Sequence, residues 1–235
     1  MIRRIISALL PALFPPRCLL DAGPATQVDL ADHLIAALEP VASTPHCPRC
    51  AQNVPAGRLC GHCLKHPPAF DRVQAAFWLD DTLKQLLHKM KYGQKPDIRI
   101  TRLLSTLARP YLVPGHVQAL VPMPLHPARL RQRGFNQARW LARDWGKAFN
   151  LPSVPAARRV LNTQQQARLD ASTRRKNLIN AFHVDNKCLR PYQHIAIVDD
   201  VLTTGATAHA LAQAIKASHP ALTIEVWVVA RTPLL

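Results

Sequence analysis

From residue 70 onward, short apolar runs alternate with segments in which apolar residues recur every three or four positions. Runs rich in β-branched residues are typical of buried strands, whereas the longer recurrence is typical of helices with one buried face. The runs predict strands at Val73–Leu79, Gln118–Met123, His194–Val198 and Ile224–Ala230. The recurrences predict helices at Asp81–Met90, Ile98–Leu112, Asn136–Phe149 and Ala206–Ser218. Strands that alternate with helices favour an α/β fold in which helices flank a mostly parallel sheet.

The first part of the chain follows a different pattern. Residues 1–45 predict a helical segment, with an amphipathic helix near the N-terminus and a second helix over Asp29–Glu39. Residues 46–68 are rich in Cys and Pro and lack hydrophobic periodicity. This composition is typical of a small module that is held together by something other than a hydrophobic core. We therefore predict a helical segment, a cysteine-rich module and an α/β domain over residues 69–235.

Four cysteines of this module have the spacing of metal ligands. They form two CxxC pairs, separated by nine residues, and are Cys47, Cys50, Cys60 and Cys63. Each thiolate pair can bind one side of a tetrahedral ion, so the pattern predicts a structural zinc site in a zinc-ribbon-like module. The same thiolates could instead hold an iron–sulfur cluster. A redox role is disfavoured, because two redox CxxC motifs in one short segment are uncommon.

A second group of polar residues follows the predicted strand that ends at Val198. The strand leads into two carboxylates, a short loop and a helix, and the candidate ligand-binding residues are Asp199, Asp200, Thr203, Thr204, Gly205, Ala206 and Thr207. Backbone N–H groups and hydroxyls at a helix N-terminus form an anion site, and a glycine lets the backbone approach a phosphate closely. Carboxylates at the end of a parallel strand can bind sugar hydroxyls or a hydrated Mg²⁺. The alternative is an ordinary strand end and helix cap.

The net charge changes this picture, because the chain has 30 Lys and Arg against 14 Asp and Glu, a formal charge of +16. Between Val121 and Arg190 there are fourteen basic residues and three acidic ones. Such an excess indicates a polyanionic partner, with nucleic acid as the first candidate, although an inert basic surface is the alternative. Residues 151–181 are predicted to be a mostly basic loop with a short helix at Ser172–Leu178.

Another basic segment follows the predicted strand at Gln118–Met123. Arg129, Arg131 and Arg133 occupy alternate positions of a predicted loop, where they could line one side and bind a pyrophosphate through bidentate contacts. Asn136 is predicted to cap the next helix. No apolar run approaches the length of about 20 residues that a membrane span needs. Together with the metal-type cysteine spacing, this predicts a cytoplasmic protein.

Several of these motifs occur in an order that resembles one known family. The string VDDVLTTGAT, residues 198–207, resembles the phosphoribosyl-pyrophosphate (PRPP) motif of type I phosphoribosyltransferases. Together with RLRQRGFNQ, residues 129–137, and the upstream CxxC pairs, it resembles the ComF family of competence-associated proteins, of GntX or ComFC type. The resemblance extends over Cys47–Pro233 and includes the segment Thr163–Phe182.

The resemblance implies specific roles within a type I phosphoribosyltransferase-like domain at residues 69–235. Asp199 and Asp200 would bind the ribose, and residues 203–207 would bind the 5′-phosphate. Arg131 and Arg133, with Mg²⁺, would face the pyrophosphate, and the basic segment Arg168–Lys176 would close over the site. The zinc module would face a partner.

The implied function is PRPP binding in DNA uptake, natural transformation or DNA utilisation. The implied partners are single-stranded DNA and a competence helicase or recombination mediator. One alternative is an active phosphoribosyltransferase in nucleotide salvage, with an unknown acceptor. Salvage enzymes often have a carboxylate where Thr203 stands, and this chain has none between Asp200 and Glu225, so no catalytic residue is assigned. The other alternative is a non-catalytic, zinc-containing module that binds single-stranded DNA.

Overall fold

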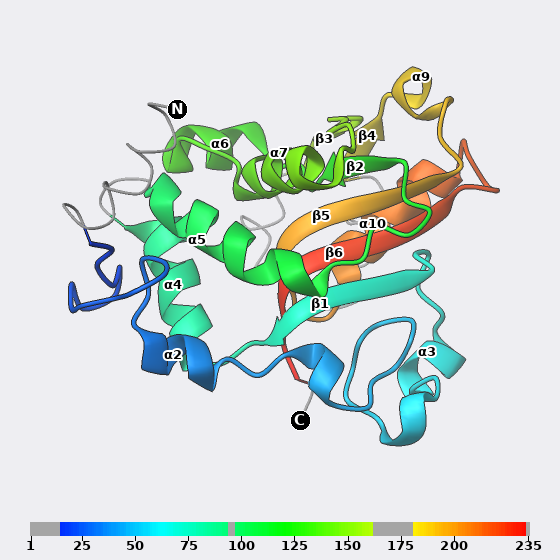
Figure 1. Ribbon diagram of the computed structural model, residues 1–235. Coiled ribbons are helices and arrows are strands. Elements are labelled where there is room, and N and C mark those ends of the chain that lie inside the picture. Colours follow the sequence, from blue (N-terminus) through cyan, green and yellow to red (C-terminus); the bar gives the residue numbers. More distant parts are fainter. Residues whose placement is uncertain (1–14, 94–96, 162–180, 234–235) are drawn as a thin grey trace.

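A parallel four-stranded sheet forms the centre of the computed structural model, which describes residues 15–93, 97–161 and 181–233 (Figure 1). The strand order is β1-β6-β5-β2, and all three neighbouring pairs are parallel. The strands are β1 (Arg72–Trp78), β2 (Ala119–Pro122), β5 (His194–Leu202) and β6 (Thr223–Arg231). In the register, Ile197 of β5 pairs with Val226 of β6 and with Val121 of β2. The predicted α/β architecture with a mostly parallel sheet is confirmed.

Helices cover both faces of this sheet, because successive side chains of a strand point to opposite faces. Ala196 and Val198 of β5 belong to a hydrophobic core on one face, with helices α4 (Asp81–Tyr92), α5 (Ile98–Ala108) and α7 (Gln137–Phe149). Ile195 and Ile197 belong to the core on the other face, with α10 (Ala206–Lys216). Three of these helices begin at side-chain caps, which accept from a backbone N–H two or three residues further on. The caps are Asp80, Asp97 and, as predicted, Asn136.

The N-terminal segment packs on the core that also contains α4 and α5. Its helix α2 (Asp32–Ala37) is shorter than the predicted Asp29–Glu39. Leu30 and Leu38, which lie within the predicted helix, are buried, but they flank the observed helix, Leu30 in a bend and Leu38 in an extended conformation. The residue before α2, Ala31, provides no side-chain cap. The cysteine-rich segment follows, with the short helices η1 (Val41–Ser43), η2 (Pro55–Gly57) and α3 (Gly61–Lys65).

Four expectations about local structure were wrong. The basic loop after β2 contains a helix, α6 (Pro127–Arg133), which begins at a proline and ends at Gly134 in the left-handed conformation. The predicted loop 151–181 contributes strand β3 (Ala157–Arg159), which pairs with β4 (Phe182–Val184) in an antiparallel hairpin. Helix α5 ends before Pro110, and a 3₁₀ turn, η3 (Arg109–Tyr111), takes the place of its predicted last turn. Strand β5 continues to Leu202, past both aspartates.

Some predictions fall outside the described residues. They are the amphipathic helix near the N-terminus, nearly all of which precedes residue 15, the helix at Ser172–Leu178 and the closing segment Arg168–Lys176. A further short helix, α9 (Asn186–Leu189), connects β4 to β5. Where the chain is described, no helix combines the length and apolar character that crossing a membrane would require.

Candidate anion-binding site and metal centre

The strongest candidate site lies at the carboxyl ends of β2 and β5. After β2 the chain passes to α6 and α7, and α7 packs on one face of the sheet. After β5 it passes to α10 on the opposite face. Because β2 and β5 are neighbours, the two connections leave a crevice between them. Ligands of open α/β sheets bind at such a switch point.

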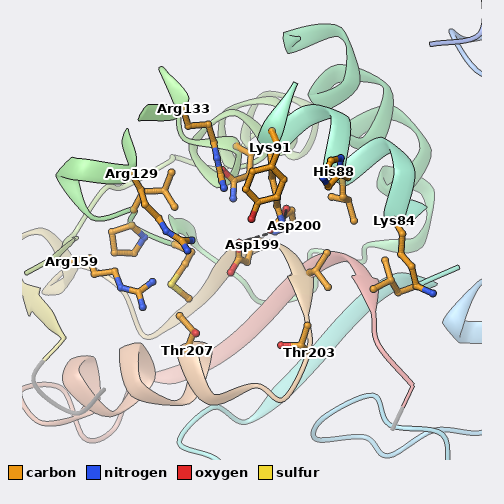
Figure 2. A pocket seen from close by; sticks show the side chains of 18 residues that line it. Lys84, His88, Lys91, Arg129, Arg133, Arg159, Asp199, Asp200, Thr203 and Thr207 are labelled. Atoms are coloured by element: carbon orange, nitrogen blue, oxygen red, sulfur yellow. Dashed lines mark hydrogen bonds and ion pairs between the residues drawn. The ribbon is translucent and has the colours of Figure 1, made fainter. Parts of the chain in front are cut away.

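A cavity of about 480 Å³ occupies this position. Figure 2 shows basic side chains arranged around Asp199 and Asp200, with Thr203 and Thr207 on the opposite wall. The cationic side chains come from α4, α6 and β3 and are Lys84, Lys91, Arg129, Arg133 and Arg159, with His88 beside them. Among the described residues, five cationic side chains and two carboxylates line this cavity, which we call the cationic cavity. The Lys84 ammonium pairs with Asp81 at 2.9 Å, and the other four cations still outnumber the two carboxylates, so the site favours an anion.

The two aspartates have different environments, because they are consecutive residues of a strand. Asp200 is 3% exposed, and its Oδ2 lies 2.6 Å from Nζ of Lys91. Burial opposes the ionisation of Asp200, but the Lys91 ammonium and hydrogen bonds from Asp199 and Gln137 together outweigh it, so the pKa of Asp200 is lowered. Burial, followed by the charge of Asp200, raises the pKa of Asp199 to about 8. Among the described residues, the lysine that forms an ion pair at this site, Lys91, pairs with Asp200 and not with Asp199.

The three arginines after β2 do not share one side, because they lie on helix α6 and not in a loop. On a helix, residues four apart lie on the same face, whereas residues two apart do not. Arg129 and Arg133 line the cavity, and Arg131 is exposed and does not. Arg133 Nη1 donates to Oε1 of Gln137 at 2.9 Å. Burial, more than any neighbouring charge, lowers the pKa of Arg129.

The loop between β5 and α10 has a different cavity on each side. Thr203 and Thr207 line the cationic cavity, whereas Thr204, Gly205 and Ala206 line a second cavity of about 400 Å³. Gly205 has φ +79°, a left-handed conformation that explains why a glycine is required at the start of α10. The five loop residues predicted to bind phosphate therefore do not all face one cavity.

Four basic residues of the cationic cavity were not among the predicted site residues. Lys84, His88 and Lys91 are spaced four and three residues apart on α4, so they lie along one face of that helix. This periodicity of basic residues was available from the sequence. Arg159 comes from the unpredicted hairpin β3–β4, and no local pattern indicates it.

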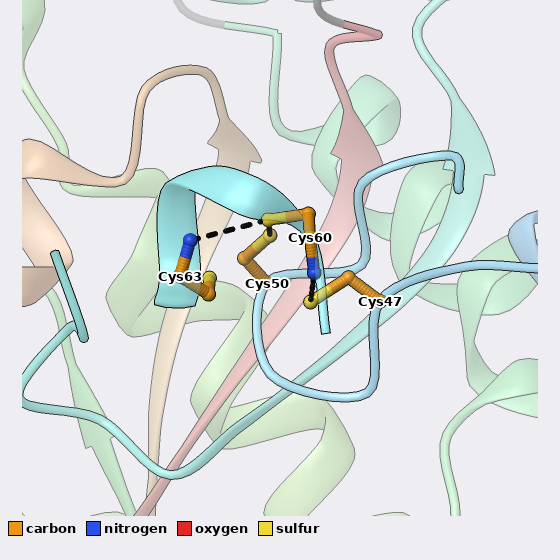
Figure 3. Close-up of side chains that lie close together, drawn as sticks. All are labelled: Cys47, Cys50, Cys60 and Cys63. Atoms are coloured by element: carbon orange, nitrogen blue, oxygen red, sulfur yellow. Dashed lines mark hydrogen bonds between the residues drawn. The ribbon is translucent and has the colours of Figure 1, made fainter. Parts of the chain in front are cut away.

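The four predicted metal ligands lie together in the cysteine-rich segment (Figure 3). All four sulfur atoms are within 4.8 Å of one another, and Sγ of Cys50 lies 3.6 Å from Sγ of Cys60. A tetrahedral zinc ion with Zn–S bonds of about 2.3 Å places its sulfurs about 3.8 Å apart, so the geometry fits one zinc ion. An iron–sulfur cluster would place additional iron and sulfide between the thiolates and hold them further apart.

Backbone N–H groups support these thiolates. The N–H of Cys60 donates to Sγ of Cys47, and that of Cys63 donates to Sγ of Cys60, both at 3.4 Å. Burial opposes the ionisation of Cys47, but the N–H groups of Cys60, Cys50 and Arg49 outweigh it and lower its pKa to about 7. Bonds of this kind fix the orientation of metal ligands.

The fold and the site thus define a class: an α/β protein with a cationic cavity at the switch point of its sheet and a four-cysteine cluster beside it. Competence protein F of Haemophilus influenzae is 30% identical over 213 residues, which cover 81% of this chain and 86% of that protein. DNA utilization protein YhgH of Salmonella typhi is 34% identical over 200 residues, covering 79% and 84%. Competence protein ComFC of Bacillus subtilis is 26% identical over 175 residues, covering 69% and 68%.

These similarities show that the chain belongs to the ComF family, which confirms the resemblance seen in its motifs. No protein-family model matches the chain.

Proposed function

We propose that this protein binds PRPP or a related phosphoribosyl ligand in the cationic cavity and acts in DNA uptake or DNA utilisation. The names of its relatives, competence protein and DNA utilization protein, support the biological setting. The cationic cavity supports the proposed ligand most strongly, because five cationic side chains and two carboxylates line it at the switch point of the sheet. A type I phosphoribosyltransferase-like fold is part of this proposal.

The ligand groups can be assigned from the residues around the cavity. The 5′-phosphate would lie near Thr203 and Thr207, at the start of α10. The pyrophosphate would face Arg129 and Arg133, whose guanidinium groups suit bidentate contacts. Asp199 would accept hydrogen bonds from the ribose hydroxyls. Asp200 would contribute through its ion pair with Lys91, and Arg131, which is exposed, would contribute least.

Magnesium was expected together with PRPP, but the protein side chains alone do not fit a magnesium site. Mg²⁺ prefers several oxygen ligands, including carboxylates. Asp200 is paired with Lys91, and the pKa of Asp199 is raised to about 8, mainly by burial. Five cations line the same cavity. We therefore derive no step through a protein-held Mg²⁺ ion.

Calorimetric titration of PRPP, with and without Mg²⁺, tests the proposed ligand. We expect Arg129→Gln or Arg133→Gln to weaken binding about tenfold, because each removes a charge-assisted hydrogen bond that contributes about 1.5–3 kcal/mol. Arg131→Gln, on the same helix but exposed, is the matched control and should change affinity little. Absence of PRPP binding, or an equal loss in all three variants, would contradict the proposal.

Catalysis is the first alternative within this function. An active transferase would release pyrophosphate when PRPP and an acceptor amine or base are supplied together. The described residues of the cavity include one carboxyl with a raised pKa, Asp199, and one imidazole, His88. Pyrophosphate release therefore has to be measured against a panel of acceptors, with wild-type protein and Asp199→Asn compared.

A second candidate function, binding of single-stranded DNA, is supported by two cavities beside α7, which share Arg139 and Trp140 and are together called the groove. Arg143 lines one of the two cavities, and Phe135 and Arg158 line the other. The guanidinium of Arg143 lies 5.6 Å from the ring centroid of Trp140. Stacking rings and cations along one groove are the elements with which proteins bind single strands.

The salt dependence of DNA binding tests this groove. For a single strand, each phosphate contact contributes about 0.7 to the slope of log K against log salt. Arg139→Gln and Arg143→Gln should each lower the slope by about that amount. Arg109→Gln, outside the groove, is the control. A slope that these variants leave unchanged would place the DNA elsewhere on the protein. A helicase or recombination mediator as protein partner stays a prediction.

A further inference from the structure

Arg231, at the end of β6, connects the cysteine cluster to the loop that follows β5. Its side chain is among the largest that are fully buried, and the residue is 2% exposed. Its Nε donates to the backbone oxygen of Cys50 at 2.9 Å. Its Nη1 donates to the backbone oxygen of Leu202 at 2.9 Å and to that of Thr203. One guanidinium group therefore donates to the backbone oxygen of a predicted metal ligand, Cys50. It also donates to the backbone oxygen of Thr203, the first residue of the loop between β5 and α10.

A buried guanidinium is costly, which makes this arrangement informative. Removing a charge from water is strongly unfavourable unless hydrogen bonds replace its hydration. Burial lowers the pKa of Arg231, and backbone oxygens, including that of Thr232 at 2.9 Å, accept its hydrogen bonds. A smaller apolar side chain would fill a strand end without this cost. The planar guanidinium of an arginine has N–H donors in fixed directions, so it can hold several acceptors in one geometry.

The cysteine cluster and the loop between β5 and α10 also line one cavity together. Cys50 and Cys63 line the second cavity, as do Thr204, Gly205 and Ala206. Phe70 lines it too, and its Cζ is 3.7 Å from the position that a Cβ of Gly205 would take. The loop is therefore a wall shared by the cationic cavity, on which Thr203 and Thr207 lie, and by the cavity next to the metal ligands.

We infer that Arg231 is a positioning residue that couples metal binding at the four cysteines to anion binding at Thr203 and Thr207. This inference rests on the proposed function, because it concerns the affinity of the same cationic cavity. When the four thiolates are held by a metal, the backbone oxygen of Cys50 has a fixed place. Arg231 then holds the backbone of Leu202 and Thr203 in the conformation that presents Thr203 and Thr207 to a phosphate. Without the metal, the Cys50 carbonyl is released and the loop loses this support.

Coupling of this kind must be reciprocal, since binding free energies are linked. If the metal strengthens PRPP binding, then PRPP must strengthen metal binding by the same factor. The wild-type protein can therefore be tested without any variant. A coupling of about 1.4 kcal/mol corresponds to a tenfold change in affinity.

The experiment measures the zinc affinity of the full chain by equilibrium competition with a chromogenic chelator, with and without PRPP. We expect saturating PRPP to raise the zinc affinity of the wild type about tenfold. Arg231→Gln should abolish the effect of PRPP on zinc affinity, and Arg231→Lys, which keeps the charge but not the planar guanidinium, should give an intermediate value. Arg72→Gln, at the amino end of β1, is the matched control and should retain the full effect. Circular dichroism before and after chelation separates coupling from unfolding.

The outcomes distinguish this inference from the proposed function. Calorimetric PRPP binding with no change in zinc affinity would overturn the coupling and leave the proposed function intact. An equal gain in zinc affinity with PRPP in the wild type and in Arg231→Gln would show that coupling exists but does not pass through Arg231, and would also overturn the inference. Absence of PRPP binding to the zinc-loaded wild type would overturn both. If Arg231→Gln does not fold, the wild-type and Arg231→Lys measurements still decide.

Discussion

The Nζ atom of Lys91 lies 2.6 Å from Oδ2 of Asp200 and joins the last turn of α4 to strand β5 beneath the cationic cavity. The two side chains are 22% and 5% exposed. The ion pair has two consequences. It keeps Asp200 ionised although that residue is buried, and it holds a lysine ammonium at the wall of the cavity. Asp199 and Asp200 are thus not two equivalent ligands for a ribose.

Removal of Lys91 should destabilise the protein strongly. Lys91→Met leaves the Asp200 carboxylate buried without its partner, and breaking such a pair costs about 3 kcal/mol. Lys91→Met combined with Asp200→Asn removes both charges and should recover much of this loss. The free energy of unfolding in urea, measured for the two single variants and the double variant, gives the coupling between the residues.

The exposed ion pair of Lys84 and Asp81, on the same helix as Lys91, provides the control for this double-mutant comparison. Lys84 and Asp81 lie 2.9 Å apart, with 58% and 88% of their side chains exposed. Such surface pairs contribute less than about 1 kcal/mol. Lys84→Met should therefore leave the stability nearly unchanged, and a loss as large as that of Lys91→Met would show that burial of the pair is not the cause.

The raised pKa of Asp199 predicts an unusual dependence of stability on pH. The folded state retains a proton on Asp199 up to about pH 8, whereas the unfolded chain releases it near its ordinary value of 3.8. Between these values the folded state binds more protons, so stability falls as the pH rises. Asp199→Asn mimics the protonated form, and we expect it to be more stable than the wild type at pH 8 by at least about 1 kcal/mol.

Urea unfolding between pH 5 and 9 checks this prediction. The difference in stability between Asp199→Asn and the wild type should grow as the pH rises. Asp185→Asn is a suitable control, because the pKa of Asp185 is lowered, chiefly by a bond from Cys188. The Asp185 carboxyl ionises at acidic pH in both the folded and the unfolded state, so its replacement should not alter how the stability changes between pH 5 and 9. A wild-type stability that does not fall across this range would contradict the assignment.

The sequence predicted the architecture because its strands are buried on both faces. Continuous apolar runs such as that ending at Val198 are recognisable from composition, and caps such as Asn136 mark where helices begin. The end of β5 was placed four residues too early, because two carboxylates interrupt the apolar run. These residues remain in the strand because Asp199 and Val201 pair with Val228 and Ala230 of β6. Such pairing is a tertiary effect that local composition does not show.

The candidate site was predictable only in part, for a similar reason. The motif at the end of β5 indicated Asp199 and Thr203, which depend on one strand-to-helix junction. The arginines depended on whether residues 127–133 form a loop or a helix, and the helix selects Arg129 and Arg133 over Arg131. Lys91 and Arg159 reach the cavity from α4 and β3, so only the packing of these elements brings them there.

Two tryptophans of α7 should differ in their contribution to stability. Trp145 is completely buried, and its Nε1 donates to the backbone oxygen of Ser105 at 3.2 Å. Trp145→Ala should cost about 3–5 kcal/mol, as is typical of deleting a large buried aromatic side chain. Trp140 is half-buried and contacts Arg143, so Trp140→Ala should cost about 1 kcal/mol. Urea unfolding measures both, and similar losses would contradict the described packing of α7.

The same two residues also test the DNA groove. Trp140 lines the groove and Trp145 lies in the core. Loss of a stacking ring costs about 1–3 kcal/mol per base, so Trp140→Ala should weaken binding of single-stranded DNA at least fivefold. Trp145→Phe, which keeps a ring in the core, is the matched control and should leave DNA affinity unchanged. Fluorescence anisotropy with a labelled oligonucleotide measures both affinities.

The four-cysteine cluster predicts one zinc ion per chain and a loss of stability when any ligand is replaced. Cys63→Ser should abolish stoichiometric zinc in native mass spectrometry and destabilise the protein by at least about 2 kcal/mol, because metal binding contributes directly to folding. The thiolates must be deprotonated to bind the metal, so zinc affinity should fall as the pH is lowered. Cys188→Ser is the control, since Cys188 is exposed and outside the cluster. Iron with acid-labile sulfide in the purified protein would show that the cluster holds an iron–sulfur centre, and a metal-free, fully stable Cys63→Ser variant would show that these thiolates do not depend on a metal.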